Sequence, residues 1–204
     1  MTRALAATLL AGSLLLLLCT ALHPVLPLTG PEDLALIAAM PHWRLIHLGL
    51  LYGTGFIMAG VWARWLAAAP AERAGLGVAF VVLGLGHALN GVNIAYMTAT
   101  GTDLAIRFHQ GQDVAVLYQA THGAAVAAGR LGGLLVAIAA AVIAGTTSST
   151  AAEPRWRVGL AWLAAGAGLA GNVLAPPGHP LMLTSIGVLA VWQVAVASEL
   201  LRRK

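Results

Sequence analysis

The sequence predicts an all-α integral membrane protein: a polytopic bundle of six transmembrane helices with both termini in the cytoplasm. Apolar residues make up 59% of its 204 residues and charged residues only 9%, whereas a soluble domain carries about 25% charged residues. Several apolar runs reach the ~20 residues that cross ~30 Å of hydrocarbon. In lipid such runs must be helical, because every backbone polar group needs an internal partner.

Six runs are expected to span the membrane within one domain, residues 1–204. Their expected limits are 2–22, 43–66, 74–98, 115–145, 158–174 and 181–201. The first run could be a signal peptide, but no clear cleavage site precedes His23, so an uncleaved span is preferred. The fourth run is longer than a bilayer requires and must tilt or project from it.

The loop after the first run contains a further helix signal. Pro31 is followed by Glu32 and Asp33 and then by a short apolar stretch that ends at Pro41. Proline at the first helical position and acids in the first turn favour a helix N-terminus. We therefore expect a short helix at the membrane interface.

Basic residues predict the orientation. Cytoplasmic loops of membrane proteins carry an excess of Lys and Arg. Two basic residues, Arg44 and Arg107, flank the spans on one side, and eight flank them on the other: Arg3, Arg64, Arg73, Arg155, Arg157, Arg202, Arg203 and Lys204. The side with eight is expected to be cytoplasmic, in a plasma (inner) membrane if the source is bacterial.

Several function classes find no support in the sequence. The net charge of +4 comes from residues at span ends, so it indicates topology and no nucleic-acid partner. The sequence contains no H-E-x-x-H, Walker, G-x-S-x-G or C-x-x-C motif. The single cysteine, Cys19, lies in an apolar run and is expected to pack there without reacting.

Histidines are the candidate functional residues. With the orientation above, none of the seven falls in a cytoplasmic loop or in the cytoplasmic half of a span. Four are expected to be solvated in or beside outer loops: His23, His42, His109 and His179. The other three, His47, His87 and His122, lie within spans, where an imidazole is costly unless it faces the bundle and has a partner. Neutral imidazole is also a common ligand of transition metals and haem iron.

The residues around these histidines suit a cofactor. Gly84 and Gly91 leave the helix face beside His87 bare, so that a flat macrocycle could approach. Arg130 lies two turns from His122 on the same face, and either an anionic ligand group, such as a haem propionate, or backbone carbonyls would satisfy it. No acid lies at an obvious matching depth, since Glu199 is near the cytoplasmic end of the last span.

The segment Trp43 to His47 and the glycine-flanked histidines resemble membrane b-type cytochromes at scattered positions. We expect haem b or a transition metal in the outer half of the bundle. His122 would be the anchor and His47 or His87 its partner, and the use would be electron transfer with a quinone or an extracytoplasmic redox partner. Two alternatives remain open. One is a membrane-embedded non-haem metalloenzyme with an open coordination position. The other is a transporter or assembly subunit without a cofactor, acting alone, as a homo-oligomer or within a larger complex.

Overall fold

The computed structural model describes residues 2–26, 30–148, 154–176, 179 and 181–202, and every regular element within them is a helix. The helices are α1 (Thr2–Leu22), α2 (Pro31–Ala39), α3 (Trp43–Leu66), α4 (Pro70–Tyr96), η1 (Met97–Gly101), α5 (Thr102–His109), α6 (Ala115–Ser148), α7 (Arg155–Leu169), η2 (Ala170–Leu174) and α8 (Leu181–Arg202). The η segments are single π-helical turns. The predicted all-α class and the expected short helix after Pro31 are confirmed.

Five helical stretches in the described part of the chain are long and apolar enough to cross a membrane. They are Arg3–Leu22, Trp43–Leu66, Pro70–His109, Ala115–Ser148 and Arg155–Leu174. The chain therefore has the character of a multi-pass membrane protein. α8 is a helix of 22 residues over the sixth expected run.

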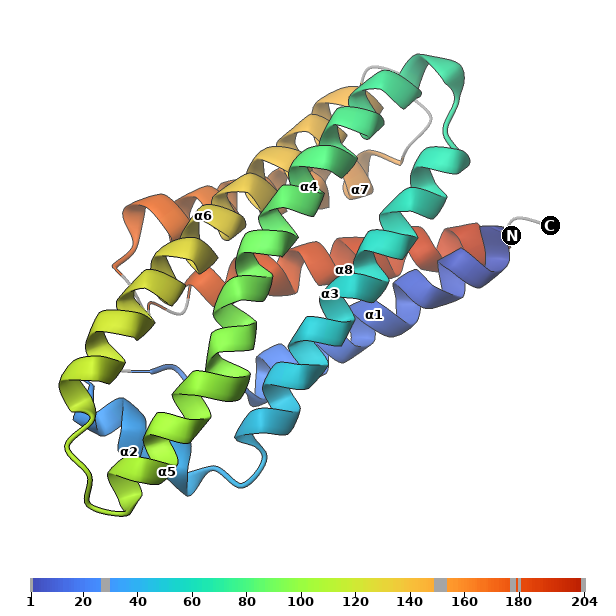
Figure 1. The fold of residues 1–204 in the computed structure, drawn as a ribbon. Coiled ribbons are helices and arrows are strands. Elements are labelled where there is room, and N and C mark those ends of the chain that lie inside the picture. Colours follow the sequence, from blue (N-terminus) through green and yellow to red (C-terminus); the bar gives the residue numbers. More distant parts are fainter. Residues whose placement is uncertain (1, 27–29, 149–153, 177–178, 180, 203–204) are drawn as a thin grey trace.

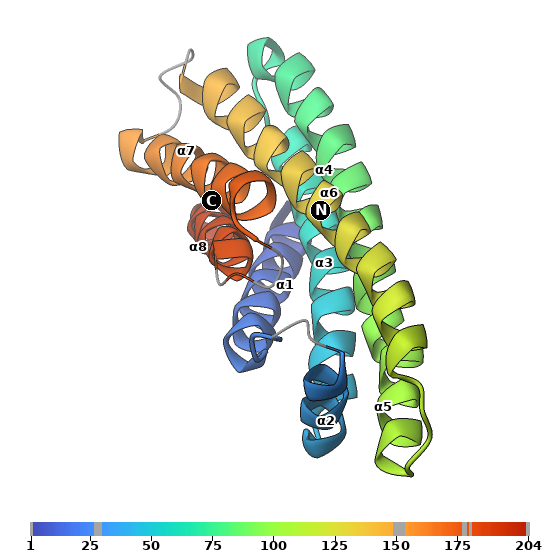
Figure 2. The same ribbon diagram turned by 90° about the vertical axis from the view of Figure 1, so that its left-hand side faces the viewer.

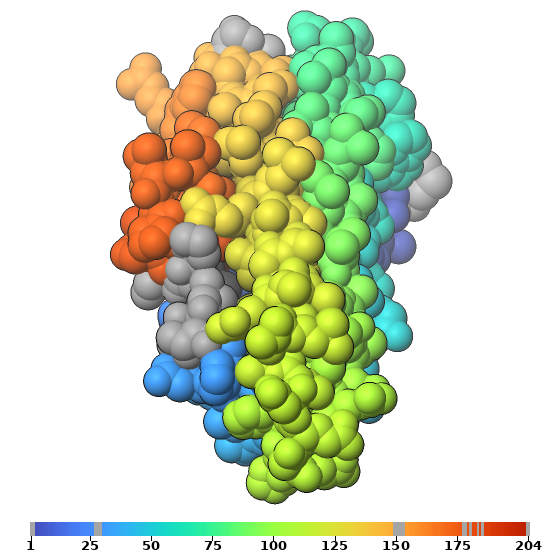
Figure 3. Space-filling model, turned by 60° about the vertical axis from the view of Figure 1, so that its left-hand side comes forward, coloured from blue at the N-terminus to red at the C-terminus, as the bar shows by residue number. Residues whose placement is uncertain are grey.

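The long helices are arranged in pairs. α1 packs along α3, α4 packs along α6, and α7 and α8 complete the bundle, with α8 also contacting α1 (Figure 1). The turn between α3 and α4 and the end of α6 lie at one end of the molecule, and α2 and α5 lie together at the other (Figures 1 and 2). In a space-filling view, α6 lies between α4 and the C-terminal helices (Figure 3).

Glycines bring the paired helices close together. A Cβ atom on Gly132 of α6 would lie 2.5 Å from the backbone oxygen of Gly86 of α4. In the other pair, Gly49 and Gly53 of α3 face Cys19 and the Gly12 backbone of α1. Small residues at these crossings let the backbones approach, which stabilises helix packing in lipid. Cys19 is buried in this contact, as expected for a packing residue.

The third apolar run differs from its expected limits of 74–98. The helix begins at Pro70 and continues through the π-turn η1 into α5, so it ends only at His109. The Thr102 hydroxyl donates to the carbonyls of Met97 and Thr98, and thus satisfies backbone oxygens at the π-turn. The polar Thr-rich stretch therefore continues the helix where a helix end was expected, and α5 reaches α2.

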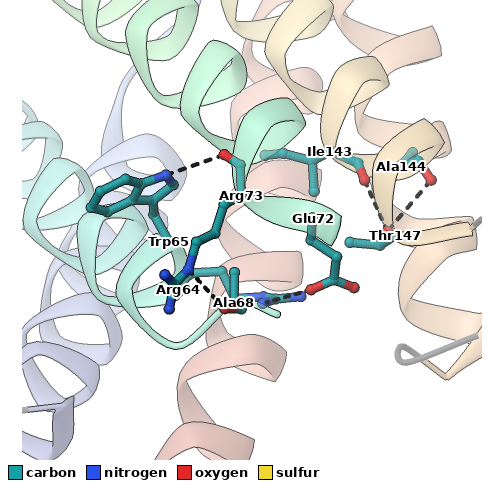
Figure 4. A network of polar contacts seen from close by, with 8 residues as sticks. All are labelled: Arg64, Trp65, Ala68, Glu72, Arg73, Ile143, Ala144 and Thr147. Carbon is teal, nitrogen blue, oxygen red and sulfur yellow. Dashed lines mark hydrogen bonds and ion pairs between the residues drawn. The ribbon is translucent and has the colours of Figure 1, made fainter. Parts of the chain in front are cut away.

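Ion pairs and hydrogen bonds organise the end of the bundle opposite α2 and α5. Arg64 of α3 pairs with the buried Glu72 of α4 at 3.7 Å, and the Trp65 indole donates to the carbonyl of Arg73 (Figure 4). Arg157 of α7 pairs with Glu199 of α8. These contacts hold the α3–α4 turn and join α7 to α8.

Candidate functional site

A cavity of ≈ 190 Å³ lies between the helix pairs. A single buried water needs roughly 10–15 Å³ by the same kind of measure, so the space suits a ligand and not just one water. The walls are mostly apolar, and every long helix and the segment after α1 contribute to them. The polar lining residues are His23, His47, His87, His122, His179, Asn90, Asn93, Thr20 and Thr54.

Five of the seven histidines thus line one cavity. The three in the spans are buried, with exposures of 2% for His47, 8% for His87 and 5% for His122, so the expectation that they face the bundle is confirmed. His42 and His109 are exposed, as expected. The expectation of a solvated loop position is wrong for His23, which is half-buried in the cavity wall, whereas His179 is exposed at the cavity edge.

The chain after α1 explains the position of His23. The helix ends at Leu22, and the extended residues that follow carry His23 over the first turn of α3. There its ring lies 5.3 Å from the ring of Trp43 and 4.9 Å from that of His47, measured between centroids. The local sequence does not predict how deeply this residue is buried. One signal was present: His23 and His179 each precede a proline, so both sit where a helix cannot continue.

His23 and His47 face each other through their Nε2 atoms, which are 3.2 Å apart. Nδ1 of His47 lies 2.9 Å from the carbonyl oxygen of Trp43, and Nδ1 of His23 lies 2.6 Å from that of Pro24. A carbonyl only accepts, so each Nδ1 carries the hydrogen and donates it. In the neutral imidazoles both Nε2 atoms then hold a lone pair, so two acceptors lie 3.2 Å apart.

The surroundings favour neutral His23. Burial lowers the pKa of His23 below its usual value, and the hydrogen bond to the Pro24 carbonyl offsets this only in part. A neutral imidazole is the form that coordinates metals.

His122 lies close to the carboxylate of Asp33. Nδ1 of His122 lies 3.9 Å from Oδ2 of Asp33, which is fully buried on α2. Tyr118, one turn before His122, is also fully buried. The expectation that no acid lies at a matching depth is therefore wrong, because the short helix α2 folds back against the start of α6 and buries Asp33 there.

His87 is buried, and its Nε2 has no hydrogen-bond partner among the described residues. Buried polar atoms are almost always satisfied, so this nitrogen is available to something in the cavity. The neighbouring Asn93 is partly in the cavity wall and packs against Gly129 of α6.

The other predicted site residues lie outside the cavity wall. Gly84 faces Met58 and Gly91 faces Leu51, both on α3, so these glycines relieve helix packing. Arg130 donates to the carbonyls of Asn172 and Ala175, at 3.1 and 2.7 Å. It thereby satisfies backbone oxygens at the π-turn η2, which is one of the two roles its position suggested.

The histidines do not form a closed metal centre as they stand. Within the described ranges, no three His, Cys, Asp or Glu side chains are close enough to hold one ion. The pair of His23 and His47 supplies two nitrogens, and the remaining histidines surround the same space from other helices. The pair of nitrogens could bind a small ion, and the other coordination positions of that ion would then be open to the cavity.

Comparison with known proteins gives no further guide: no family model, no curated protein and no solved structure matches this chain.

Proposed function

We propose that this chain is an integral membrane protein that binds a transition-metal ion through histidines in the outer half of its bundle. One observation supports this most: His23 and His47 each direct Nδ1 at a backbone carbonyl, which leaves both Nε2 atoms for the cavity. Metal-ligating histidines have this arrangement, because a carbonyl or carboxylate partner fixes the tautomer and orients the ring.

The proposal includes six spans with both termini in the cytoplasm. α8 would be the sixth span, and its Glu199 would be tolerated near the membrane because Arg157 pairs with it. The excess of basic residues at the end that carries the α3–α4 turn supports the orientation. The cavity would then open toward the extracytoplasmic side.

Electron exchange with a quinone or an extracytoplasmic redox partner is the use we propose for the metal. Among the described residues that line the cavity there is no carboxylate or thiol. These groups often act as nucleophiles in enzymes, so the cavity offers less to a covalent reaction than to electron exchange. Neutral nitrogens in apolar surroundings favour the lower charge state of a metal, so the reduced ion would be the resting form and would give one electron to such a partner.

Haem b is the second candidate, supported by the unpartnered Nε2 of His87 in an apolar cavity that His122 also lines. The pair of His23 and His47 does not suit it. Two axial nitrogens stand about 4 Å apart, twice a metal–nitrogen bond of ~2.0 Å, and a macrocycle must pass between the rings. Here the nitrogens are 3.2 Å apart. Haem would therefore have to use the other histidines.

Metal analysis of the purified protein tests the proposal. We expect about one transition-metal ion per chain, a loss of most of it in His47→Ala, and no change in His42→Ala, whose histidine is exposed and outside the cavity. A visible spectrum of the same samples separates the candidates, because only haem gives a Soret band. Protein that carries neither metal nor haem, after expression with both supplied, would overturn the proposal.

A further inference from the structure

The contact between His23 and His47 is unfavourable when both imidazoles are neutral. Nε2 of His23 and Nε2 of His47 are 3.2 Å apart, and both Nδ1 hydrogens are donated to carbonyls. Each Nε2 is therefore an acceptor without a donor, and two acceptors repel at this distance. A cation between them turns the repulsion into two bonds.

We propose that this cation is copper(I), held by Nε2 of His23 and Nε2 of His47; the inference rests on the proposed metal-binding function. The geometry suits a bent pair of ligands. With metal–nitrogen bonds of about 2.0 Å, nitrogens 3.2 Å apart subtend roughly 105° at the metal, close to the tetrahedral angle. Both nitrogens can then bind one ion at their present separation.

The charge of the surroundings selects a monovalent ion. Within the described part of the chain, no Asp, Glu, Lys or Arg lines the cavity, and most of its wall is apolar. Burying charge without a counter-charge is costly, and the cost rises steeply from one charge to two. A divalent ion held by neutral imidazoles alone would keep both of its charges, whereas copper(I) brings only one.

The chemistry of the wall points the same way. Imidazole binds several first-row metals, but thioethers select copper(I) among them. Met97 and Met182 line the same cavity as the histidine pair. The carbonyl of Met97 accepts the indole hydrogen of Trp43, whose ring lies 4.2 Å from the ring of His47, and the Met97 sulfur lies beside Gly101, one turn further along the helix. Hard ions, which need oxygen ligands, find no carboxylate among these lining residues.

The test is an anaerobic titration of the full-length protein in detergent with copper(I), against a coloured copper(I) chelator, and in parallel with zinc(II). We expect one copper(I) per chain and at least tenfold weaker binding in His23→Ala and in His47→Ala. The double variant should lose no more than a few-fold beyond either single one, because losing one ligand already opens the pair. His42→Ala and His109→Ala, at exposed histidines, should bind as the wild type does. Size-exclusion profiles and helical circular dichroism establish that each variant is folded.

The outcomes separate the two proposals. Zinc(II) or iron bound at the cavity histidines without copper(I) would overturn the inference and leave the metal-binding function in place. Copper(I) binding that survives both single substitutions in folded protein would place the ion elsewhere, and would also overturn the inference. If no metal binds, both proposals fail, and the histidine pair holds a shared proton instead.

Discussion

At the scale of single residues, second partners decide what the buried histidines can do. His47 is oriented by a carbonyl of its own helix, whereas Nδ1 of His122 lies 3.9 Å from the carboxylate of Asp33, on a helix that is distant in sequence. The first arrangement follows from helix geometry, since Trp43 lies four residues before His47. The second depends on where α2 folds back, and no local pattern around Asp33 or His122 indicates it.

Asp33 gives a prediction at this scale. Replacing it with Ala should destabilise the protein by about 1–3 kcal/mol, because it leaves the buried His122 without the carboxylate near it. Unfolding in detergent micelles, followed by circular dichroism, measures the change. Glu32→Gln on the exposed face of the same helix should change stability by less than 0.5 kcal/mol or so. Equal effects of the two substitutions would mean that Asp33 stabilises only α2 itself.

At the scale of elements, most helices could be predicted from the sequence, but which helices and loops pack against each other could not. Runs of apolar residues fixed α1 at Thr2–Leu22 and α3 at Trp43–Leu66, because their length and the adjacent Pro and polar residues are local properties. The continuation of α4 through η1 into α5 was missed, since Gly101 and the neighbouring threonines usually indicate a helix end. His23 was assigned to solvent for a related reason: the path of a loop over a bundle is a tertiary property.

The crossing of α4 and α6 gives a prediction at this scale. A Cβ on Gly132 would meet the backbone of Gly86 at 2.5 Å and of Asn90 at 2.8 Å, and neither backbone atom can move alone. Gly132→Ala should therefore cost about 1–3 kcal/mol through overpacking and lower the thermal midpoint in detergent. Gly123→Ala on the same helix has nothing within 4 Å and should be neutral or slightly stabilising, since alanine favours helix over glycine. A midpoint that is unchanged in Gly132→Ala would show that the helices separate freely there.

At the scale of the whole molecule, the Arg–Glu ion pairs and the cavity histidines lie toward opposite ends. The ion pair of Arg64 with Glu72 joins α3 to α4 at the end of the bundle away from α2 and α5 (Figure 4), and that of Arg157 with Glu199 joins the first turn of α7 to the last turn of α8. The cavity histidines lie toward α2, whose Asp33 supports one of them. One end thus carries ion pairs between helices, and the other carries the cavity with its histidines.

This polarity makes the membrane topology the prediction with the widest consequence. With six spans, a reporter fused after Lys204 and one fused before Thr2 should both be cytoplasmic, whereas one inserted at Gly111, between α5 and α6, should be on the other side. Fusions to alkaline phosphatase and to a fluorescent protein that matures only in the cytoplasm report the two sides independently. Termini on opposite sides would mean that α8 does not cross, which would leave five spans, the number that length and apolarity alone give for the described residues. Both termini outside would place the histidine cavity toward the cytoplasm, and an extracytoplasmic redox partner could then no longer reach the metal.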